Sequence, residues 1–221
     1  MFRRIISRNL KTTEVVVSKI FPAGCGWQYG SITATQQYCI PSDIQFALMC
    51  GGYEGLAVGM GHWTYMVGKK IVYDEEVDMR LETYKSLQFG TASMMSGIVW
   101  QPTVDFLRHD GFYMAATGTG LTCSVFFFGG LTLSKYLTCN KTNQVINIEN
   151  TVKDALLSLS IGGATAMFVA TDPLIYGNIL KNIYGIGDTL DYNSIYMAGF
   201  STASGFIGIQ FIQNFNKNWI G

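Results

Sequence analysis

This sequence contains few charged residues. Charged side chains make up 14% of its 221 residues, against about 25% in a typical soluble domain. The fifteen basic and fifteen acidic residues cancel. The chain therefore lacks the net charge that keeps soluble proteins apart, and it lacks the basic excess of a nucleic-acid-binding protein. Its fourteen Phe, twelve Tyr and ten Met exclude intrinsic disorder, so a membrane protein is the class that remains.

Signatures of catalysis and metal binding are also missing from the sequence. Two histidines, His62 and His109, are too few and too scattered for a metal cluster, and the five cysteines form no Cys-x-x-Cys pair. The sequence contains no HExxH motif, no phosphate-binding loop and no dinucleotide-binding glycine fingerprint. We therefore expect a protein that is not an enzyme and that uses no cofactor or metal.

Long stretches without Asp, Glu, Lys or Arg are, in contrast, abundant. A helix crosses the bilayer core with about 20 apolar residues, and a soluble helix of that length would carry charges along one face. Four regions built on such stretches predict transmembrane helices over residues 86–107, 111–134, 155–177 and 192–214. The predicted fold class is an all-α integral membrane bundle, with a fifth membrane-embedded helix over residues 44–68.

Region 44–68 differs from the other four because it combines a carboxylate with a stripe of glycines. Gly51, Gly55 and Gly59 fall on one helix face, which allows a neighbouring helix to approach closely in lipid. Four spans would place thirteen basic residues on one side of the membrane and two on the other, as the positive-inside rule favours. Five spans would divide them seven against eight. The number of spans therefore stays open, and a re-entrant or buried fifth helix would satisfy both patterns.

Small residues recur at a spacing of four in the other predicted helices. We expect close helix contacts at Ala116, Gly120, Gly199 and Ala203. Two pairs of helices also share spaced patterns. Ser-Leu-x-x-Gly-x-Ala-x-x-Met occurs at 86–95 and at 158–167, and Tyr-Met-Ala-x-x-x-Thr occurs at 113–119 and at 196–202. Either two related helical hairpins or chance agreement among apolar helices explains these matches.

Glu54 is the candidate functional residue inside the predicted membrane region. A carboxylate within a membrane helix is costly, and such a group is a functional candidate by default. Its role is either to carry a proton or an ion, or to pair with a polar group of a neighbouring helix or subunit. We favour the structural role because the sequence offers no second intramembrane charge to continue a relay.

The first eleven residues are basic and contain no acid. Arg3, Arg4, Arg8 and Lys11 are interleaved with apolar residues, which is typical of a mitochondrial targeting segment or of an arm that contacts anionic lipid such as cardiolipin. Residues 20–42 are uncharged but too polar to span a membrane. We therefore predict a basic arm and a polar surface stretch over 1–43 and a membrane domain over 44–216, with a charged loop at 69–85.

The glycine stripe of region 44–68, followed by further helices rich in small residues, resembles the four-helix channel family of mitochondrial inner-membrane translocases. A relative of that family is an accessory subunit of respiratory complex I. The resemblance implies a helical bundle of the mitochondrial inner membrane. The possible extra span and the charge distribution depart from the family pattern, and we transfer no functional residue from the family to this chain.

These observations together predict a multi-pass protein of the mitochondrial inner membrane. We expect a structural accessory subunit of a large complex, of the respiratory chain or of ATP synthase, that acts in assembly, helix packing and lipid contact. Its partners would be other membrane subunits and lipids, and not nucleic acid. Two alternatives stay open: a transporter or channel for a small solute or ion that uses Glu54, and a haem- or quinone-binding anchor that uses His62.

Overall fold

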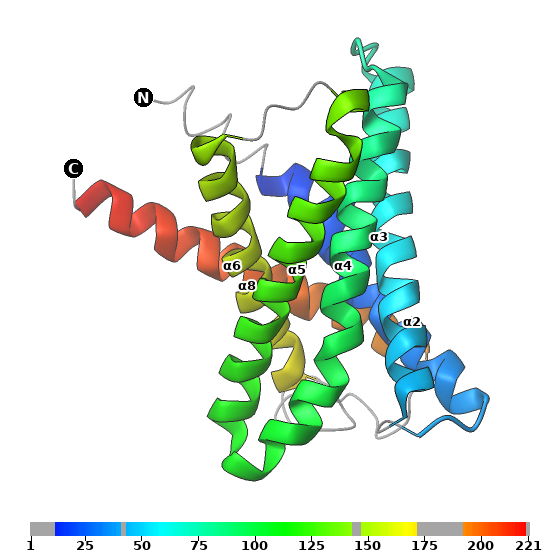
Figure 1. The fold of residues 1–221 in the computed structure, drawn as a ribbon, viewed down its shortest axis with the longest axis vertical. Coiled ribbons are helices and arrows are strands. Elements are labelled where there is room, and N and C mark those ends of the chain that lie inside the picture. The colour runs from blue at the N-terminus through cyan, green and yellow to red at the C-terminus, as the bar shows by residue number, and fades with distance from the viewer. Residues whose placement is uncertain (1–11, 41–42, 143–146, 172–191, 220–221) are drawn as a thin grey trace.

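The chain folds as a bundle of helices in the computed structural model, which describes residues 12–40, 43–142, 147–171 and 192–219 (Figure 1). These residues contain no β-strand, which confirms the prediction of an all-α fold. The elements are η1 (Val16–Ile20, a π-helix), α2 (Phe21–Gln36), α3 (Ile44–Val72), α4 (Met79–Leu107), η2 (Arg108–Asp110, a 3-10 helix), α5 (Phe112–Thr142), α6 (Ile148–Thr171) and α8 (Tyr192–Trp219).

The long helices form a closed ring. Each helix packs against the next one along the chain, and α8 packs back against α2. Figure 1 shows that α3 and α5 run antiparallel to α4 and α6, whereas α8 crosses the bundle obliquely. Residues at the two ends of the described chain are therefore brought together, as in the hydrogen bond from Thr202 Oγ1 on α8 to the carbonyl oxygen of Ile20 (3.3 Å).

The helix ends follow from local chemistry as well as from the uncharged stretches. α4 begins at Met79 because the Asp78 carboxylate accepts hydrogen bonds from the backbone N–H groups of Arg80 and Leu81. Gly111 separates η2 from α5 with φ of 102°, a conformation that glycine adopts readily. The predicted charged loop at 69–85 is thus reduced to a short connection, since both flanking helices extend into it. Residues 172–177 of the helix predicted over 155–177 lie outside the described residues.

The prediction of a polar surface stretch over residues 20–42 is wrong where η1 and α2 form. α2 packs inside the ring against α3 and α8, and its Trp27 is only 2% exposed. Several polar groups of this helix find partners within the protein: Gln28 Nε2 donates to Ser194 Oγ (2.9 Å), and two threonines donate to carbonyl oxygens one turn earlier. Average polarity does not indicate which side chains face the protein, so the sequence alone misplaced this segment.

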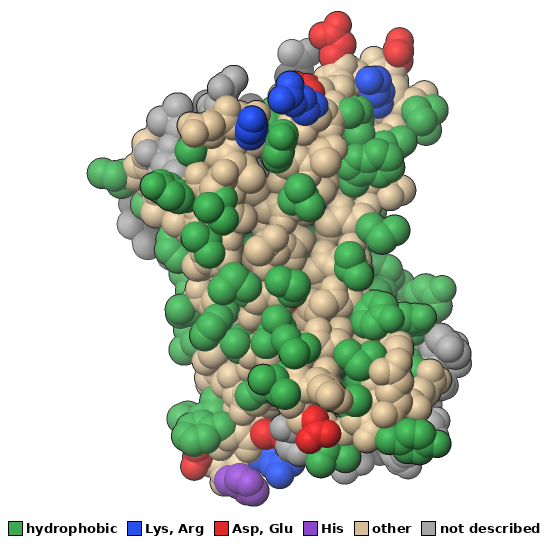
Figure 2. Space-filling model, turned by 45° about the vertical axis from the view of Figure 1, so that its right-hand side comes forward, with side chains coloured by type: hydrophobic (Ala, Val, Ile, Leu, Met, Phe, Trp, Pro, Cys, Tyr) green, Lys and Arg blue, Asp and Glu red, His purple; other side chains and the backbone are tan. Residues whose placement is uncertain are grey.

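Charged side chains gather at the two ends of the bundle and leave an uncharged belt between them (Figure 2). One end, which we call the basic end, holds the last turns of α3 and α5 and the first turns of α4 and α6. Among the side chains that the structure describes, eight Lys and Arg lie at this end: Lys19, Lys69, Lys70, Arg80, Lys85, Lys135, Lys141 and Lys153. Of the same set, Arg108 alone lies at the opposite end. The segment η1, which precedes α2, therefore brings Lys19 to the same end as the α3–α4 connection.

Two described helical segments are long and apolar enough to cross a membrane by composition, namely α5 and residues Ile148–Val169 of α6. Four such helices were expected. α4 is a counterpart of similar length, but Gln88, Ser93, Ser96 and Gln101 make it more polar, and all four side chains are buried inside the bundle. The polar side chains of α4 therefore face the protein interior. Average hydropathy does not show which way a side chain faces, so it underrates this helix as a membrane span.

Glycines lie where the helices touch. A Cβ atom on Gly55 of α3 would lie 2.6 Å from the carbonyl oxygen of Gly90 on α4, and one on Gly51 would lie 2.6 Å from the backbone nitrogen of Ile98. Both positions therefore require glycine at the α3–α4 contact. Gly59 lies further from α4, where a Cβ would be at ordinary contact distance from Ser86. The close approach of backbones replaces large interlocking side chains in this interface.

The remaining predicted contact residues lie in other interfaces of the ring. A Cβ on Gly120 of α5 would lie 2.5 Å from the carbonyl oxygen of Gly162 on α6, and Gly199 of α8 lies against Phe21 and Cys25 of α2. Two further predicted contact residues, Ala116 and Ala203, are buried.

The repeated pattern of α4 and α6 corresponds to repeated packing. In α4, Gly90 touches the preceding helix α3, whereas Ala92 and Met95 touch Gly130 of the following helix α5. In α6, the matching Gly162 touches the preceding helix α5, and the matching Ala164 and Met167 touch Gly205 of α8. Equivalent positions thus perform equivalent contacts. The matched patterns of α5 and α8 do not extend this agreement. They are 83 residues apart, so Gly130 of α5 would correspond to residue 213 of α8, whereas the glycine that makes the equivalent contact is Gly205.

Candidate functional site

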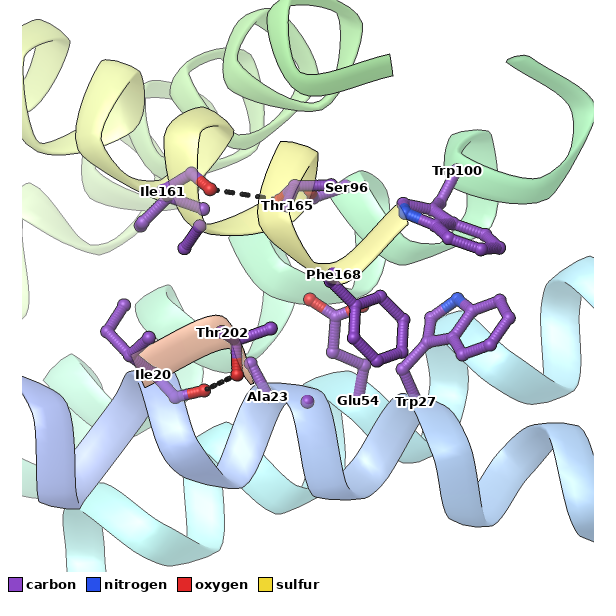
Figure 3. A pocket seen from close by; sticks show the side chains of 12 residues that line it. Ile20, Ala23, Trp27, Glu54, Ser96, Trp100, Ile161, Thr165, Phe168 and Thr202 are labelled. Atoms are coloured by element: carbon purple, nitrogen blue, oxygen red, sulfur yellow. Dashed lines mark hydrogen bonds between the residues drawn. The ribbon is translucent and has the colours of Figure 1, made fainter. Parts of the chain in front are cut away.

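A cavity of about 40 Å³ lies in the centre of the ring, a volume that holds roughly three or four water molecules at about 10–15 Å³ each. Figure 3 shows its walls, which come from α2, α3, α4, α6 and α8. Most of the lining is apolar. The polar groups in the wall are the side chains of Trp27, Glu54, Ser96, Trp100, Thr165 and Thr202.

Glu54 supplies the only acidic side chain among the described residues of this wall. Ser93 Oγ of α4 donates a hydrogen bond to Glu54 Oε1 (2.6 Å). The second oxygen, Oε2, lies where a side chain at position 97 would otherwise stand, so Gly97 leaves the room that the carboxyl group occupies. No basic side chain of the described residues forms an ion pair with Glu54, whereas six other acids near the bundle ends do form ion pairs: Glu14, Glu75, Glu82, Asp105, Glu149 and Asp154. The carboxyl group therefore lies inside the bundle, with one hydroxyl partner at Oε1 and with Oε2 against Gly97.

Three aromatic rings close the cavity on one side. Trp27 of α2 and Trp100 of α4 have ring centroids 4.1 Å apart, and Phe168 of α6 lies 5.2 and 5.4 Å from them. Both indoles are 2% exposed, yet neither indole N–H has a hydrogen-bond partner among the described residues. In Figure 3 the nitrogen edge of each indole faces the interior of the group, while the six-membered rings point away from Glu54.

The other side of the cavity is closed by an apolar cluster. Ile20 of η1, Ala164 of α6 and Phe206 of α8 are buried against one another. Thr165 and Thr202 at the cavity wall use their hydroxyl hydrogens on backbone carbonyl oxygens, so they present acceptor oxygens to the cavity. The site thus combines two N–H donors, hydroxyl oxygens and one carboxyl group around one cavity.

A second polar cluster lies at the basic end, between α3 and α4. Glu82 accepts hydrogen bonds from Lys85 Nζ (2.6 Å) and contacts His62 Nε2 (2.9 Å). Burial alone would raise the pKa of Glu82, but the hydrogen bonds and charges of Lys85 and His62 outweigh it and hold the pKa below its usual value. Lys19 lies over the ring of Phe89, 4.6 Å from its centroid. We interpret this cluster as the anchor that joins η1 to α3 and α4.

The histidines do not form a haem site of the two-histidine kind. His62 is buried and engaged with Glu82, whereas His109 lies in η2 at the opposite end of the bundle. The groups of three or more metal-binding side chains that a metal ion would need do not occur in the described residues. The predicted lipid-contacting residues Arg3, Arg4, Arg8 and Lys11 lie outside the described residues.

The structure brings Glu54 together with residues that the sequence did not indicate as partners. Trp27 belongs to the segment that was predicted to lie on the surface, and Trp100 lies within an apolar stretch like any core residue. The only available signal was the rarity of tryptophan, with four in the chain. Comparison of the chain with family models, curated proteins and solved structures gave no match, so the resemblance to the translocase channel family stays a hypothesis.

Proposed function

We propose that this chain is a multi-pass protein of the mitochondrial inner membrane and serves as a structural accessory subunit of a large complex. The observation that carries this proposal is the uncharged belt between two charged ends (Figure 2). Large apolar side chains are exposed along the helices between the two ends, including Leu56, Met60, Leu121, Val125 and Phe126. A contiguous apolar surface of this extent is a liability in water and is suited to lipid.

The depth of the belt fits a bilayer. The charge-free residues 86–104 of α4 rise by about 28 Å, and residues 111–134 of α5 rise by about 36 Å, at about 1.5 Å per residue. The hydrocarbon core of a bilayer is about 30 Å thick, and a longer helix is accommodated by tilting. Helices that each cross this depth would therefore explain why charges stop where they do.

The charge asymmetry supports an orientation. Eight of the described basic side chains lie at one end and one lies at the other. The positive-inside rule assigns the basic end to the inner side of a membrane, which is the matrix side in a mitochondrion. The basic opening segment of the sequence supports the mitochondrial assignment by its composition.

The small size of the central cavity favours a structural role over solute transport. Trp27, Trp100 and Phe168 close one side of the cavity and an apolar cluster closes the other. Backbone contacts at glycines hold neighbouring helices close together. A bundle packed in this way is suited to contacts at its outer surface, and it provides no wide pathway for a solute through its centre.

The outer surface provides places for neighbours. One apolar groove of about 440 Å³ lies between α3 and α4, and another of about 710 Å³ lies between α5, α6 and α8. Gly52 lies in the first groove and Gly208 in the second, and a Cβ atom added at either position would meet no atom within 4 Å. Acyl chains or helices of partner subunits are the expected neighbours in a membrane.

The experiment that tests this proposal is native electrophoresis of gently solubilised mitochondria, followed by mass spectrometry of the band that contains this chain. We expect migration with subunits of the respiratory chain or of ATP synthase. Migration as a small monomer or homo-oligomer would contradict the accessory role.

Deletion of the protein provides the functional control. An accessory subunit should lower the amount of one assembled complex while the turnover of each remaining complex stays unchanged. Full assembly after deletion would contradict the proposal, and restored assembly with the full chain would exclude an unrelated defect.

A further inference from the structure

The central cavity has features that packing alone does not explain. Two indole N–H groups, those of Trp27 and Trp100, are buried without a partner among the described residues. A buried donor left without a hydrogen bond costs about 1–3 kcal/mol, and native structures avoid this cost in the great majority of cases. Both donors line the cavity into which the carboxyl group of Glu54 also points (Figure 3).

The size and the donor set restrict what the cavity can hold. A volume of about 40 Å³ admits small molecules of the size of water and excludes an organic cofactor. A metal or ammonium cation would satisfy Glu54 but would face two N–H donors. A water molecule can accept a hydrogen bond from an indole and donate one to the carboxyl group, so water satisfies both sides of the cavity.

The charge of Glu54 is the second feature of the site that needs an explanation. An unpaired carboxylate in an apolar interior is far more costly than a neutral carboxyl group, and such groups take up a proton instead. α2 presents Trp27 and Gly26 to Glu54, α4 presents Ser93 and Gly97, and none of these side chains carries a charge. The titratable neighbours are two thiols, Cys50 one turn away on α3 and Cys123 on α5, whose thiol donates to the carbonyl oxygen of Ser96.

We infer that Glu54, Trp27 and Trp100 form a hydrated proton-binding site in the centre of the bundle. The carboxylate binds one proton and becomes the neutral acid, and the reverse step returns the proton to water in the cavity. The indoles hold that water by donating their N–H hydrogens to its oxygen. Ser93 keeps its hydrogen bond to Glu54 Oε1 in both states, so the second oxygen, Oε2, is the atom that gains and loses the proton.

The test is infrared spectroscopy of the purified protein in phospholipid vesicles at neutral pH. We expect a carbonyl band of a protonated carboxyl group in the wild type, and its complete loss in Glu54→Gln. The matched control is Glu149→Gln, which removes an exposed carboxylate paired with Lys153 at the basic end and should leave the band unchanged. Identical spectra of the wild type and Glu54→Gln would overturn the inference.

Three further measurements keep the test decisive if Glu54→Gln fails to fold. Carbon-13 labelling of glutamate in the wild type should shift the same band, because no other residue type is proposed to carry it. Trp100→Phe should change the position of the band, whereas Trp63→Phe on the outer groove should not. Nuclear magnetic resonance of nitrogen-15-labelled indoles should show contact of Trp27 and Trp100 with water, and the absence of water contact at both would refute the hydrated site.

Discussion

Replacement of Gly55 by alanine tests how the ring is held together. The added Cβ atom would lie 2.6 Å from the carbonyl oxygen of Gly90 and 2.7 Å from Met94 Cβ, where ordinary contacts are 3.4–4 Å. The first neighbour is backbone, so α3 and α4 must separate by about 0.8 Å or more. Overpacking of this kind costs about 1–3 kcal/mol. The better helix propensity of alanine returns about 1 kcal/mol, which leaves a net loss of up to roughly 2 kcal/mol.

Gly52 provides a matched control in the same helix. It lies three residues earlier, and a Cβ there would have no neighbour within 4 Å, so Gly52→Ala should gain up to about 1 kcal/mol from helix propensity alone. The assay is thermal unfolding in lipid nanodiscs, followed by the helical circular dichroism signal. A change of 1 kcal/mol corresponds to about 2–4 °C in a domain of this size. Gly55→Ala should therefore melt lower than the wild type and Gly52→Ala slightly higher. A shift of both variants in the same direction would refute the packing argument.

Two further predictions concern the ends of the bundle. Glu82→Gln should destabilise the protein by about 1.5–3 kcal/mol, the net contribution of a hydrogen bond to a charged group. The pKa of Glu82 in the folded protein lies below its usual value of 4.5. The difference in stability between the wild type and Glu82→Gln should therefore be complete above pH 4.5 and should shrink as the pH falls through the lowered pKa. A pH-independent difference in melting temperature would contradict the role of the Glu82 charge. Cys39 and Cys139, both partly exposed, lie at opposite ends of the bundle, so a membrane-impermeant maleimide added to mitoplasts should label Cys39 and should reach Cys139 only after permeabilisation. Equal labelling of both cysteines in sealed mitoplasts would argue against the proposed topology.

The helices that the sequence predicted well are those bounded by charge. α3 and α8 begin at the predicted residues 44 and 192, and α4 ends at the predicted residue 107. The prediction falls short where it ends a helix at the first charged residue. Glu82 and Lys135 lie within helices that continue past the uncharged belt, because a helix gains backbone hydrogen bonds in water as well as in an apolar layer.

The helix that the sequence missed is α2, in which several polar side chains form hydrogen bonds inside the protein. Gln28 counts as a polar residue in any average, yet it is 1% exposed and hydrogen-bonded to Ser194 on α8. That partner is 166 residues away, so no local pattern contains the information. The same limit applies to the central site. Glu54 was recognisable from its chemistry alone, whereas Trp27 and Trp100 reach it only because α2 and α4 both face the centre of the ring.

The contact between α2 and α8 has a consequence for biogenesis. α2 and α8 come from opposite ends of the described chain, yet they are neighbours in the ring. Contacts between segments so distant in sequence form late, because closing a long loop costs entropy before the contact contributes any stability. The side of the cavity that Thr202 provides stays open until α8 docks. The cavity wall around the carboxyl group of Glu54 is therefore completed in the last step of folding, which makes a complete wall a sign that the whole bundle has been assembled.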